Sequence, residues 1–347
     1  MTLRGRISLT WRFGKGAFLI GVVYNLMCAG LQTSGFSYTF MVDSFIPVFF
    51  TKTFKVNAFV VQLFMPCPKK LLTCNDMRNL PLFMMLMMPF CLSARHYEVF
   101  GPQGGVYTEL SLPARFNPDT DKCHLVILMH GFGANGRVAP LSHIRRALLK
   151  EGYAVLRLDF NGYGRSEGAI VDNTVPLMLE DAMAVWKYAS ELPYVDGIVL
   201  LGHSQGGLVA SMLAGRLQEA GTAPSALVLM APASNIKDFA AEGRFFGISC
   251  NPLDPPASIS IYGIKVGRKY ILSAQALDVF GEASRYTGPV CLLQGDSDKI
   301  VPPSCSQEYH ENYSNSELHI INGCGHQFLG HKREADSFFL NFLSRSL

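Results

Sequence analysis

Short apolar runs and helical patterns alternate along residues 95–347 of this 347-residue chain. The apolar runs have the length and composition of buried strands, and they are Leu125–Met129, Ala154–Asp159, Gly197–Leu201, Val290–Gln294 and Glu317–Ile321. Helical patterns fill the stretches 142–150, 175–191, 207–219, 303–312 and 332–346. Regular alternation of strand and helix is typical of βαβ units, so it predicts an α/β fold with an open, mostly parallel, doubly wound sheet. About 250 residues suffice for one domain with a sizeable core.

Residues 1–94 lack such a pattern, but two apolar runs stand out in them. The first, 16–30, follows several basic residues and is a candidate membrane anchor, although it is shorter than the ~20 apolar residues of a spanning helix. The second, 80–92, follows Met77-Arg78 and ends at Ser93-Ala94, which is the layout of a secretory signal peptide.

We therefore expect Met77 to be the true start, 77–94 to be a signal peptide and 1–76 to be an over-extended reading of the gene. This predicts a secreted or periplasmic protein whose folded part is 95–347. The alternatives are a real membrane-anchoring prefix, through which alone the protein would contact a membrane, and an extra folded domain.

Charge is unevenly distributed between the two parts. Residues 1–94 carry a net charge of +7 and residues 95–347 a net charge of −4, which together give the +3 of the whole chain. A folded part without a basic stripe argues against binding to nucleic acid. The nine cysteines include no C-x-x-C pair, and no spacing of His, Cys and carboxylate residues indicates a metal site. We expect neither a disulfide framework nor a cofactor.

The segment Gly202-His203-Ser204-Gln205-Gly206 has the pattern G-x-S-x-G between a predicted strand and a predicted helix. In that context the pattern is typical of a nucleophile elbow, in which the serine hydroxyl stands exposed at a sharp turn. The glycines permit the turn and keep bulk away from Ser204. Ser204 is the candidate nucleophile.

A serine hydroxyl needs a base that takes its proton and an acid that orients the base. Asp298 lies in the loop after the predicted strand Val290–Gln294 and is the predicted acid, while its rival Asp296 is expected to shape the turn. His326 lies on a glycine-flanked loop after the last predicted strand and is the predicted base. His203, beside the nucleophile, is expected to pack below the site.

A fourth element of such a site follows the predicted strand Leu125–Met129, where the chain reads His130-Gly131-Phe132. A His-Gly turn at this place typically aims a backbone N–H at the developing oxyanion. We predict that the backbone N–H groups of Phe132 and Gln205 form the oxyanion hole. The residues together predict a serine hydrolase that acts through an acyl-enzyme.

Six segments resemble the α/β-hydrolase superfamily and, more narrowly, bacterial feruloyl (cinnamoyl) esterases. They are HGFGAN (130–135), DFNGYGRSEG (159–168), GHSQGGLVASMLAG (202–215), LMAPAS (229–234), GDSDKIVP (295–302) and GCGHQF (323–328). The resemblance spans about 97–345 and implies the α/β-hydrolase fold with a small inserted cap segment at about 235–286, which covers the acyl pocket.

The resemblance also implies substrate contacts in the cap. A family tyrosine that bonds the phenolic hydroxyl of the substrate maps onto Tyr270, and a family aspartate maps onto Asp238 if one residue is skipped. A family glutamine has no counterpart, since Phe245-Phe246 stands near its place.

We expect release of hydroxycinnamic acids such as ferulate from small-molecule or polysaccharide-linked esters. A broad short-chain carboxylesterase or acylglycerol lipase is the alternative. A serine peptidase of the same superfamily and a catalytically inactive scaffold are further readings.

Overall fold

The computed structural model describes residues 7–13, 17–23, 53–56, 59–62 and 98–347. The chain divides into two compact units, Met1–His96 and Tyr97–Leu347. The predicted signal peptide, 77–94, lies outside the described residues, whereas part of the apolar run 16–30 forms a strand. No helix within the described ranges is long and apolar enough to cross a lipid bilayer.

The described strands of the first unit form two small antiparallel sheets. These pair β1 (Ile7–Phe13) with β2 (Ala17–Val23) and β3 (Thr53–Val56) with β4 (Phe59–Gln62).

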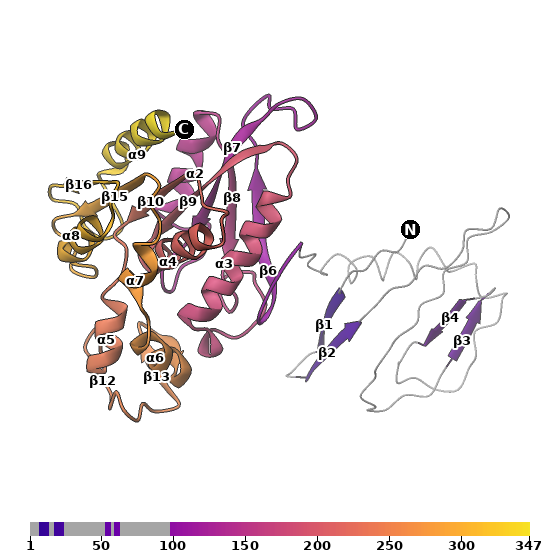
Figure 1. The fold of residues 1–347 in the computed structure, drawn as a ribbon. Coiled ribbons are helices and arrows are strands. Elements are labelled where there is room, and N and C mark those ends of the chain that lie inside the picture. The colour runs from indigo at the N-terminus through magenta and orange to yellow at the C-terminus, as the bar shows by residue number, and fades with distance from the viewer. Residues whose placement is uncertain (1–6, 14–16, 24–52, 57–58, 63–97) are drawn as a thin grey trace. The chain divides into compact units, whose positions relative to one another are not determined.

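An eight-stranded sheet forms the centre of the second unit, in the order β16-β15-β10-β9-β7-β8-β6-β5 (Figure 1). All neighbours from β16 to β8 run parallel, whereas β6 is antiparallel to β8 and β5 is antiparallel to β6. The strands are β5 (Val99–Gly101), β6 (Gly104–Ser111), β7 (Cys123–Met129), β8 (Ala154–Asp159), β9 (Val195–His203), β10 (Ala226–Met230), β15 (Val290–Gly295) and β16 (Ser316–Ile321). The predicted mostly parallel sheet is confirmed.

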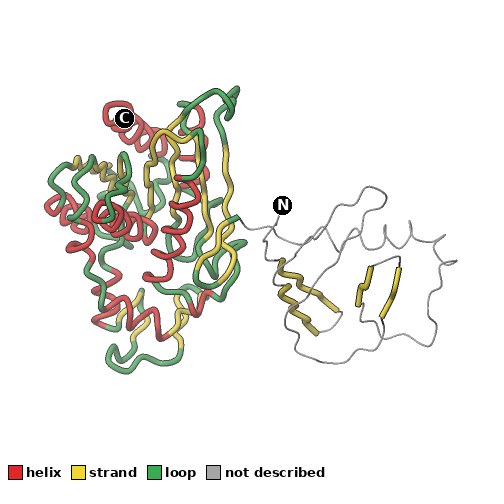
Figure 2. The backbone as a smooth tube through the Cα atoms, turned by 45° about the vertical axis from the view of Figure 1, so that its right-hand side comes forward, coloured by secondary structure: helices red, strands yellow, loops and turns green. Residues whose placement is uncertain are grey.

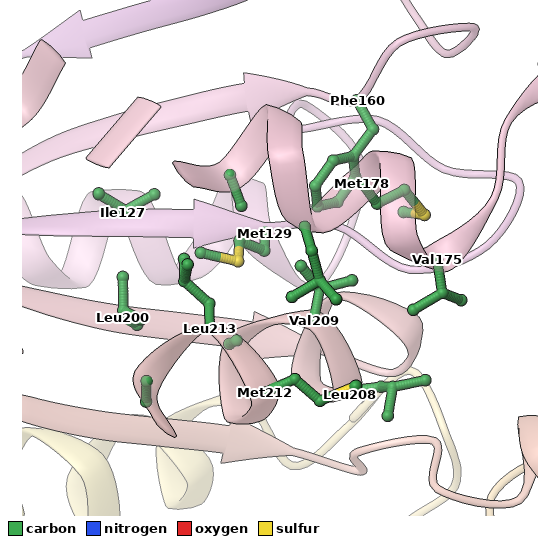
Figure 3. Packing of buried hydrophobic residues seen from close by; sticks show 14 of the residues in the cluster. Ile127, Met129, Phe160, Val175, Met178, Leu200, Leu208, Val209, Met212 and Leu213 are labelled. Atoms are coloured by element: carbon green, nitrogen blue, oxygen red, sulfur yellow. The ribbon is translucent and has the colours of Figure 1, made fainter. Parts of the chain in front are cut away.

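Helices cover both faces of this sheet. Its longer helices are α2 (Leu141–Lys150), α3 (Val175–Ser190), α4 (Gln205–Glu219), α8 (Pro303–Asn312) and α9 (Lys332–Ser346). Side chains alternate along each strand, so Ile127 and Met129 pack with α3 and α4, while Val126 and Leu128 pack with α2 and α9. Figure 3 shows the first of these cores, where Leu213 of α4 lies near Met129. The two cores hold the strands in a fixed register.

The segment between β10 and β15 lies outside the main sheet. It contains α5 (Ile236–Glu242), the strand pairs β11 (Arg244–Phe245) with β12 (Ile248–Ser249) and β13 (Ser258–Ile261) with β14 (Ile264–Gly267), then α6 (Arg268–Gln275) and α7 (Val279–Ala283). Its helices α5 and α6 project with β12 and β13 beyond one end of the sheet, as both tube and ribbon show (Figures 1 and 2). We call this segment the cap.

Candidate active site

Ser204 lies at the sharp turn between β9 and α4. Its backbone has φ 58° and ψ −123°, a positive φ that is uncommon for a residue with a side chain. The N–H of Ser204 donates to the carbonyl of Met230 at 2.9 Å, and its carbonyl accepts from the N–H of Ala233 at 3.1 Å. The neighbouring strand β10 and the loop after it therefore stabilise the strained turn.

Close backbone contacts explain the glycines around Ser204. A Cβ on Gly202 would lie 2.2 Å from the carbonyl oxygen of Gly206, and a Cβ on Gly206 would lie 2.3 Å from the carbonyl oxygen of Met129. A Cβ on Gly131 would lie 2.8 Å from the Cβ of Ser204. Each of these positions excludes any larger residue unless the elbow moves.

The structure brings Ser204, His326 and Asp298 together from three strand ends. His326 Nε2 lies 2.9 Å from Ser204 Oγ, and His326 Nδ1 lies 2.7 Å from Asp298 Oδ2. An imidazole that donates its Nδ1–H to the carboxylate has an unprotonated Nε2, which is free to accept the proton of the serine hydroxyl. This is the arrangement that a serine nucleophile and its base require.

Buried hydrogen bonds fix the carboxylate of Asp298. Its Oδ1 accepts from the backbone N–H groups of Ile300 at 2.8 Å and Val301 at 3.0 Å. Burial raises the pKa of Asp298, but the hydrogen bond and charge of His326 together with these two N–H groups outweigh it, so the net pKa lies below the ordinary value. Asp298 is therefore ionised at neutral pH.

A second layer supports the same carboxylate from behind. Gln294 Nε2 donates to Asp298 Oδ2 at 3.3 Å, and Ser306 Oγ donates to Gln294 Oε1 at 2.7 Å. Asp296 has a different role, because its Oδ1 accepts from the N–H of Gly323 at 2.7 Å and thus shapes the turn.

His203 supports the predicted base through a hydrogen bond to the backbone of His326. Its ring Nε2 lies 2.8 Å from the carbonyl oxygen of His326, so this nitrogen carries the proton and donates it. Burial and the neighbouring His326 lower the pKa of His203 to about 3, so its ring is neutral over the whole physiological range.

His130 ties the loop after β7 to the end of β8. Its Nε2 accepts from the N–H of Phe160 at 3.1 Å, so Nδ1 carries the proton and donates to the carbonyl of Gly131 at 2.9 Å. Burial lowers the pKa of His130, which keeps this bonding pattern intact at neutral pH. The next residue, Phe132, lines the same cavity as Ser204 and Gln205. The N–H of Gln205 lies in the first turn of α4, where no helical carbonyl accepts it.

A cavity of about 480 Å³ opens beside Ser204 and is walled by the cap. Its lining is mainly apolar and aromatic, and none of its described residues is Asp, Glu, Lys or Arg: Gly131, Phe132, Gly133, Ala134, Val138, Ala139, His203, Ser204, Gln205, Ala233, Asn235, Ile236, Phe239, Phe245, Phe246, Ile261, Tyr262, Tyr270, Ile300, Val301, His326 and Gln327. Tyr270 is buried in this wall, and its hydroxyl accepts from Gln205 Nε2 at 2.9 Å. The structure does not bring Asp238 to the cavity, because this residue is exposed on α5.

Sequence reasoning missed the contacts of His130, of Gln294 and of the Gln205 side chain. The signals were present, since a His before the oxyanion loop and a polar residue at the end of a buried strand both break an apolar run. Their partners lie far away in the chain, so the sequence did not identify them.

Comparison with known proteins agrees with this geometry. A family model described as serine aminopeptidase, S33 (Hydrolase_4), matches residues 120–248. A solved structure of Est1E from Butyrivibrio proteoclasticus with bound ferulic acid is 29% identical, with a TM-score of 0.66, and the match covers 70% of this chain and 95% of that one. A monoacylglycerol lipase from Mycolicibacterium smegmatis is 27% identical over 66% of this chain and 88% of its own length.

A lysophosphatidylserine lipase, ABHD12 from Danio rerio, is 32% identical over 59% of this chain, but the match spans only about half of that protein, 51%. The chain therefore has the α/β-hydrolase fold and resembles serine esterases and lipases.

Proposed function

We propose that the chain is a carboxylic-ester hydrolase that acts through an acyl-enzyme on Ser204. The observation that carries the proposal is the hydrogen-bonded series Asp298–His326–Ser204, which ends at a cavity whose described lining residues include no Asp, Glu, Lys or Arg. An uncharged cavity suits a neutral ester better than a charged substrate, because burying an unpaired charge is costly.

The proposed reaction begins when Ser204 Oγ attacks the ester carbonyl while His326 Nε2 takes its proton. Asp298 holds the imidazole in the required tautomer and stabilises the imidazolium. The N–H groups of Phe132 and Gln205 bind the oxyanion, and each such donor contributes about 3 kcal/mol in other enzymes. His326 then protonates the leaving alcohol, and a water molecule releases the acid by the same route.

As acyl group we propose a hydroxycinnamate such as ferulate. The aromatic cavity wall, in which the buried Tyr270 hydroxyl is a polar group, supports this proposal, since such a ligand is flat, apolar and phenolic at its far end. The likeness to Est1E with bound ferulic acid supports it too.

An acylglycerol lipase is the second candidate, because the apolar cavity also suits an alkyl chain and a monoacylglycerol lipase is among the relatives. An aminopeptidase is less well supported, since the described cavity residues include no carboxylate that would bind a terminal ammonium group.

The test compares kcat/KM of the full chain on methyl ferulate, p-nitrophenyl butyrate and a monoacylglycerol. Ser204→Ala is the control and is expected to lose nearly all turnover of every substrate while it keeps the melting temperature of the parent. Preference for methyl ferulate supports the hydroxycinnamoyl pocket. Preference for either other ester, with activity lost in Ser204→Ala, supports ester hydrolysis but contradicts the proposed hydroxycinnamoyl group. Full activity of Ser204→Ala contradicts the proposed mechanism.

We also propose that the protein is secreted after cleavage of 77–94. N-terminal sequencing of protein from its native host tests this. A mature start near Arg95 agrees with the proposal, whereas peptides from 1–70 in the mature protein contradict it.

A further inference from the structure

Three side chains with different metal-binding groups meet on the sheet face that α9 covers. Cys291 of β15 is paired with Glu317 of β16 in the parallel register, and His319 follows two residues after Glu317. Because side chains alternate along a strand, all three point to the same face. Their sulfur, carboxylate oxygen and imidazole nitrogen all lie within 4.8 Å of one another.

We propose that Cys291, Glu317 and His319, the β15–β16 cluster, bind a divalent transition-metal ion of the zinc type. Zinc bonds to S, N and O of about 2.0–2.3 Å place tetrahedral ligand atoms about 3.3–3.7 Å apart, so side-chain shifts of about 1 Å bring the three atoms to this spacing and leave the fourth position to a water molecule. Glu317 Oε1 and His319 Nε2 already lie 3.0 Å apart. The mixture of thiolate, imidazole and carboxylate favours zinc-like ions over Mg²⁺ and Ca²⁺, which prefer oxygen ligands alone.

Two residues of α9 orient the ligands. Arg345 donates to Glu317 Oε2 at 2.8 Å, which leaves Oε1 turned toward His319. The ring of Phe338 stacks on the imidazole of His319, with 4.2 Å between ring centres and 20° between planes. Contacts of this kind fix ligand geometry around bound metals.

The burial of the three ligands indicates how an ion would reach the cluster and which proton its binding would release. Cys291 is fully buried, whereas Glu317 and His319 are partly exposed, so an ion enters from the side of β16. Burial raises the pKa of the Cys291 thiol, so at neutral pH the thiol is protonated. Binding therefore breaks the S–H bond, forms a sulfur–metal bond and releases one proton to solvent, while the His319 proton that faces Glu317 moves from Nε2 to Nδ1 so that Nε2 can bind the ion.

The position indicates a stabilising ion rather than a reacting one. Cys291 precedes the end of β15 by four residues, which is about 13 Å of strand, so the cluster is well separated from the loop of Asp298. An ion there would cross-link the two strands whose following loops carry Asp298 and His326. The cluster was not predictable from the sequence, because only the strand register joins Cys291 to residues 26 and 28 positions later. This proposal does not depend on the proposed function.

The test titrates the full chain with Co²⁺ and follows the thiolate-to-cobalt charge-transfer absorption, with Zn²⁺ added in competition. The parent is expected to give a one-to-one band that Zn²⁺ displaces, and Zn²⁺ is expected to raise its melting temperature. Cys291→Ala should lose both effects. His319→Gln should weaken binding by at least about 10–100-fold, the loss known for mere supporting partners of metal ligands.

Cys305→Ala is the matched control, since Cys305 is another buried thiol but lies on α8. It should keep the band. A parent without the band, or a band that persists in Cys291→Ala because other cysteines supply it, would overturn the proposal. If Cys291→Ala does not fold, the partly exposed His319→Gln decides the matter, and unchanged affinity in that variant refutes the site.

Discussion

Replacement of Asp298 by Asn is expected to move the proton of the His326 imidazole from Nδ1 to Nε2, while it leaves the shape of the site unchanged. The two backbone N–H groups of Ile300 and Val301 hold Oδ1, and they will continue to hold the carbonyl oxygen of the amide. The new NH₂ group then occupies the place of Oδ2, where it faces His326 Nδ1 at 2.7 Å and Gln294 Nε2 at 3.3 Å. Both of these groups donate in the parent, so two donors would oppose the NH₂ group.

The clash with His326 is relieved when the imidazole moves its proton from Nδ1 to Nε2. Nδ1 then accepts from the amide, but Nε2 points its proton at Ser204 Oγ, 2.9 Å away, and cannot take the serine proton. The same change lowers kcat by about 10⁴-fold in a serine protease through the wrong tautomer. That loss equals about 5 kcal/mol of transition-state stabilisation, and we expect a loss of that size here.

The assay is the pre-steady-state and steady-state hydrolysis of a chromogenic ester by Asp298→Asn, Asp296→Asn and the parent, with the melting temperature of each. Asp296→Asn is the matched control, because Asp296 belongs to the same loop and bonds the N–H of Gly323 instead of His326. We expect it to keep most of the parental kcat. The assignment of the acid would be wrong if Asp298→Asn retained more than a tenth of the parental kcat while Asp296→Asn lost nearly all of it.

Further predictions concern the oxyanion loop, the core and the cavity. Gly131→Ala places a methyl group 3.3 Å from Ser204 Oγ and 2.8 Å from its Cβ, so we expect kcat to fall at least about 100-fold, as for a lost oxyanion donor, at unchanged secondary structure by circular dichroism. Burial raises the pKa of Asp181 from 3.8 to about 7, so the folded state loses stability as pH rises between these values. Asp181→Asn lacks this titration. In urea unfolding, its free energy of unfolding relative to the parent should therefore increase by up to about 4 kcal/mol from pH 4 to pH 8. Tyr270→Phe removes the hydroxyl proposed to bond the substrate phenol, so KM for methyl ferulate should rise about 3–10-fold relative to KM for methyl cinnamate, which lacks the phenol. The simultaneous loss of the bond from Gln205 Nε2 affects both esters alike.

Local periodicity predicted the parts of the fold that have strong amphipathic or buried patterns. Strand β8 and helices α8 and α9 begin and end at the residues expected from the sequence, which are Ala154–Asp159, Pro303–Asn312 and Lys332–Ser346. Helix α4 begins two residues earlier than expected, at Gln205. Glycine is a poor helix former, so Gly206 weakened the sequence signal, but the close contact of α4 with β7 requires it.

The cap was predictable as an insertion but not as a structure. Its strands have two to four residues, too few for a period to be recognised, and their shape depends on turns at Gly247 and Gly263 with positive φ. Cap residues at the cavity were therefore predicted from a resemblance alone. That resemblance led to Tyr270, which lines the cavity, and to Asp238, which does not.

The difference between what was and was not predictable follows from the place of each residue on its strand. Parallel strands all end at one edge of the sheet, so a polar residue just after a strand meets the others there whatever the register, and Ser204, Asp298 and His326 required only strand order. Residues within a strand meet only if the register is known. Contacts such as His203 with His326, and the β15–β16 cluster, depend on that register and on the helix that covers it. The chemistry at the sheet edge was therefore visible in the sequence, whereas the contacts that hold it in place became visible only in the structure.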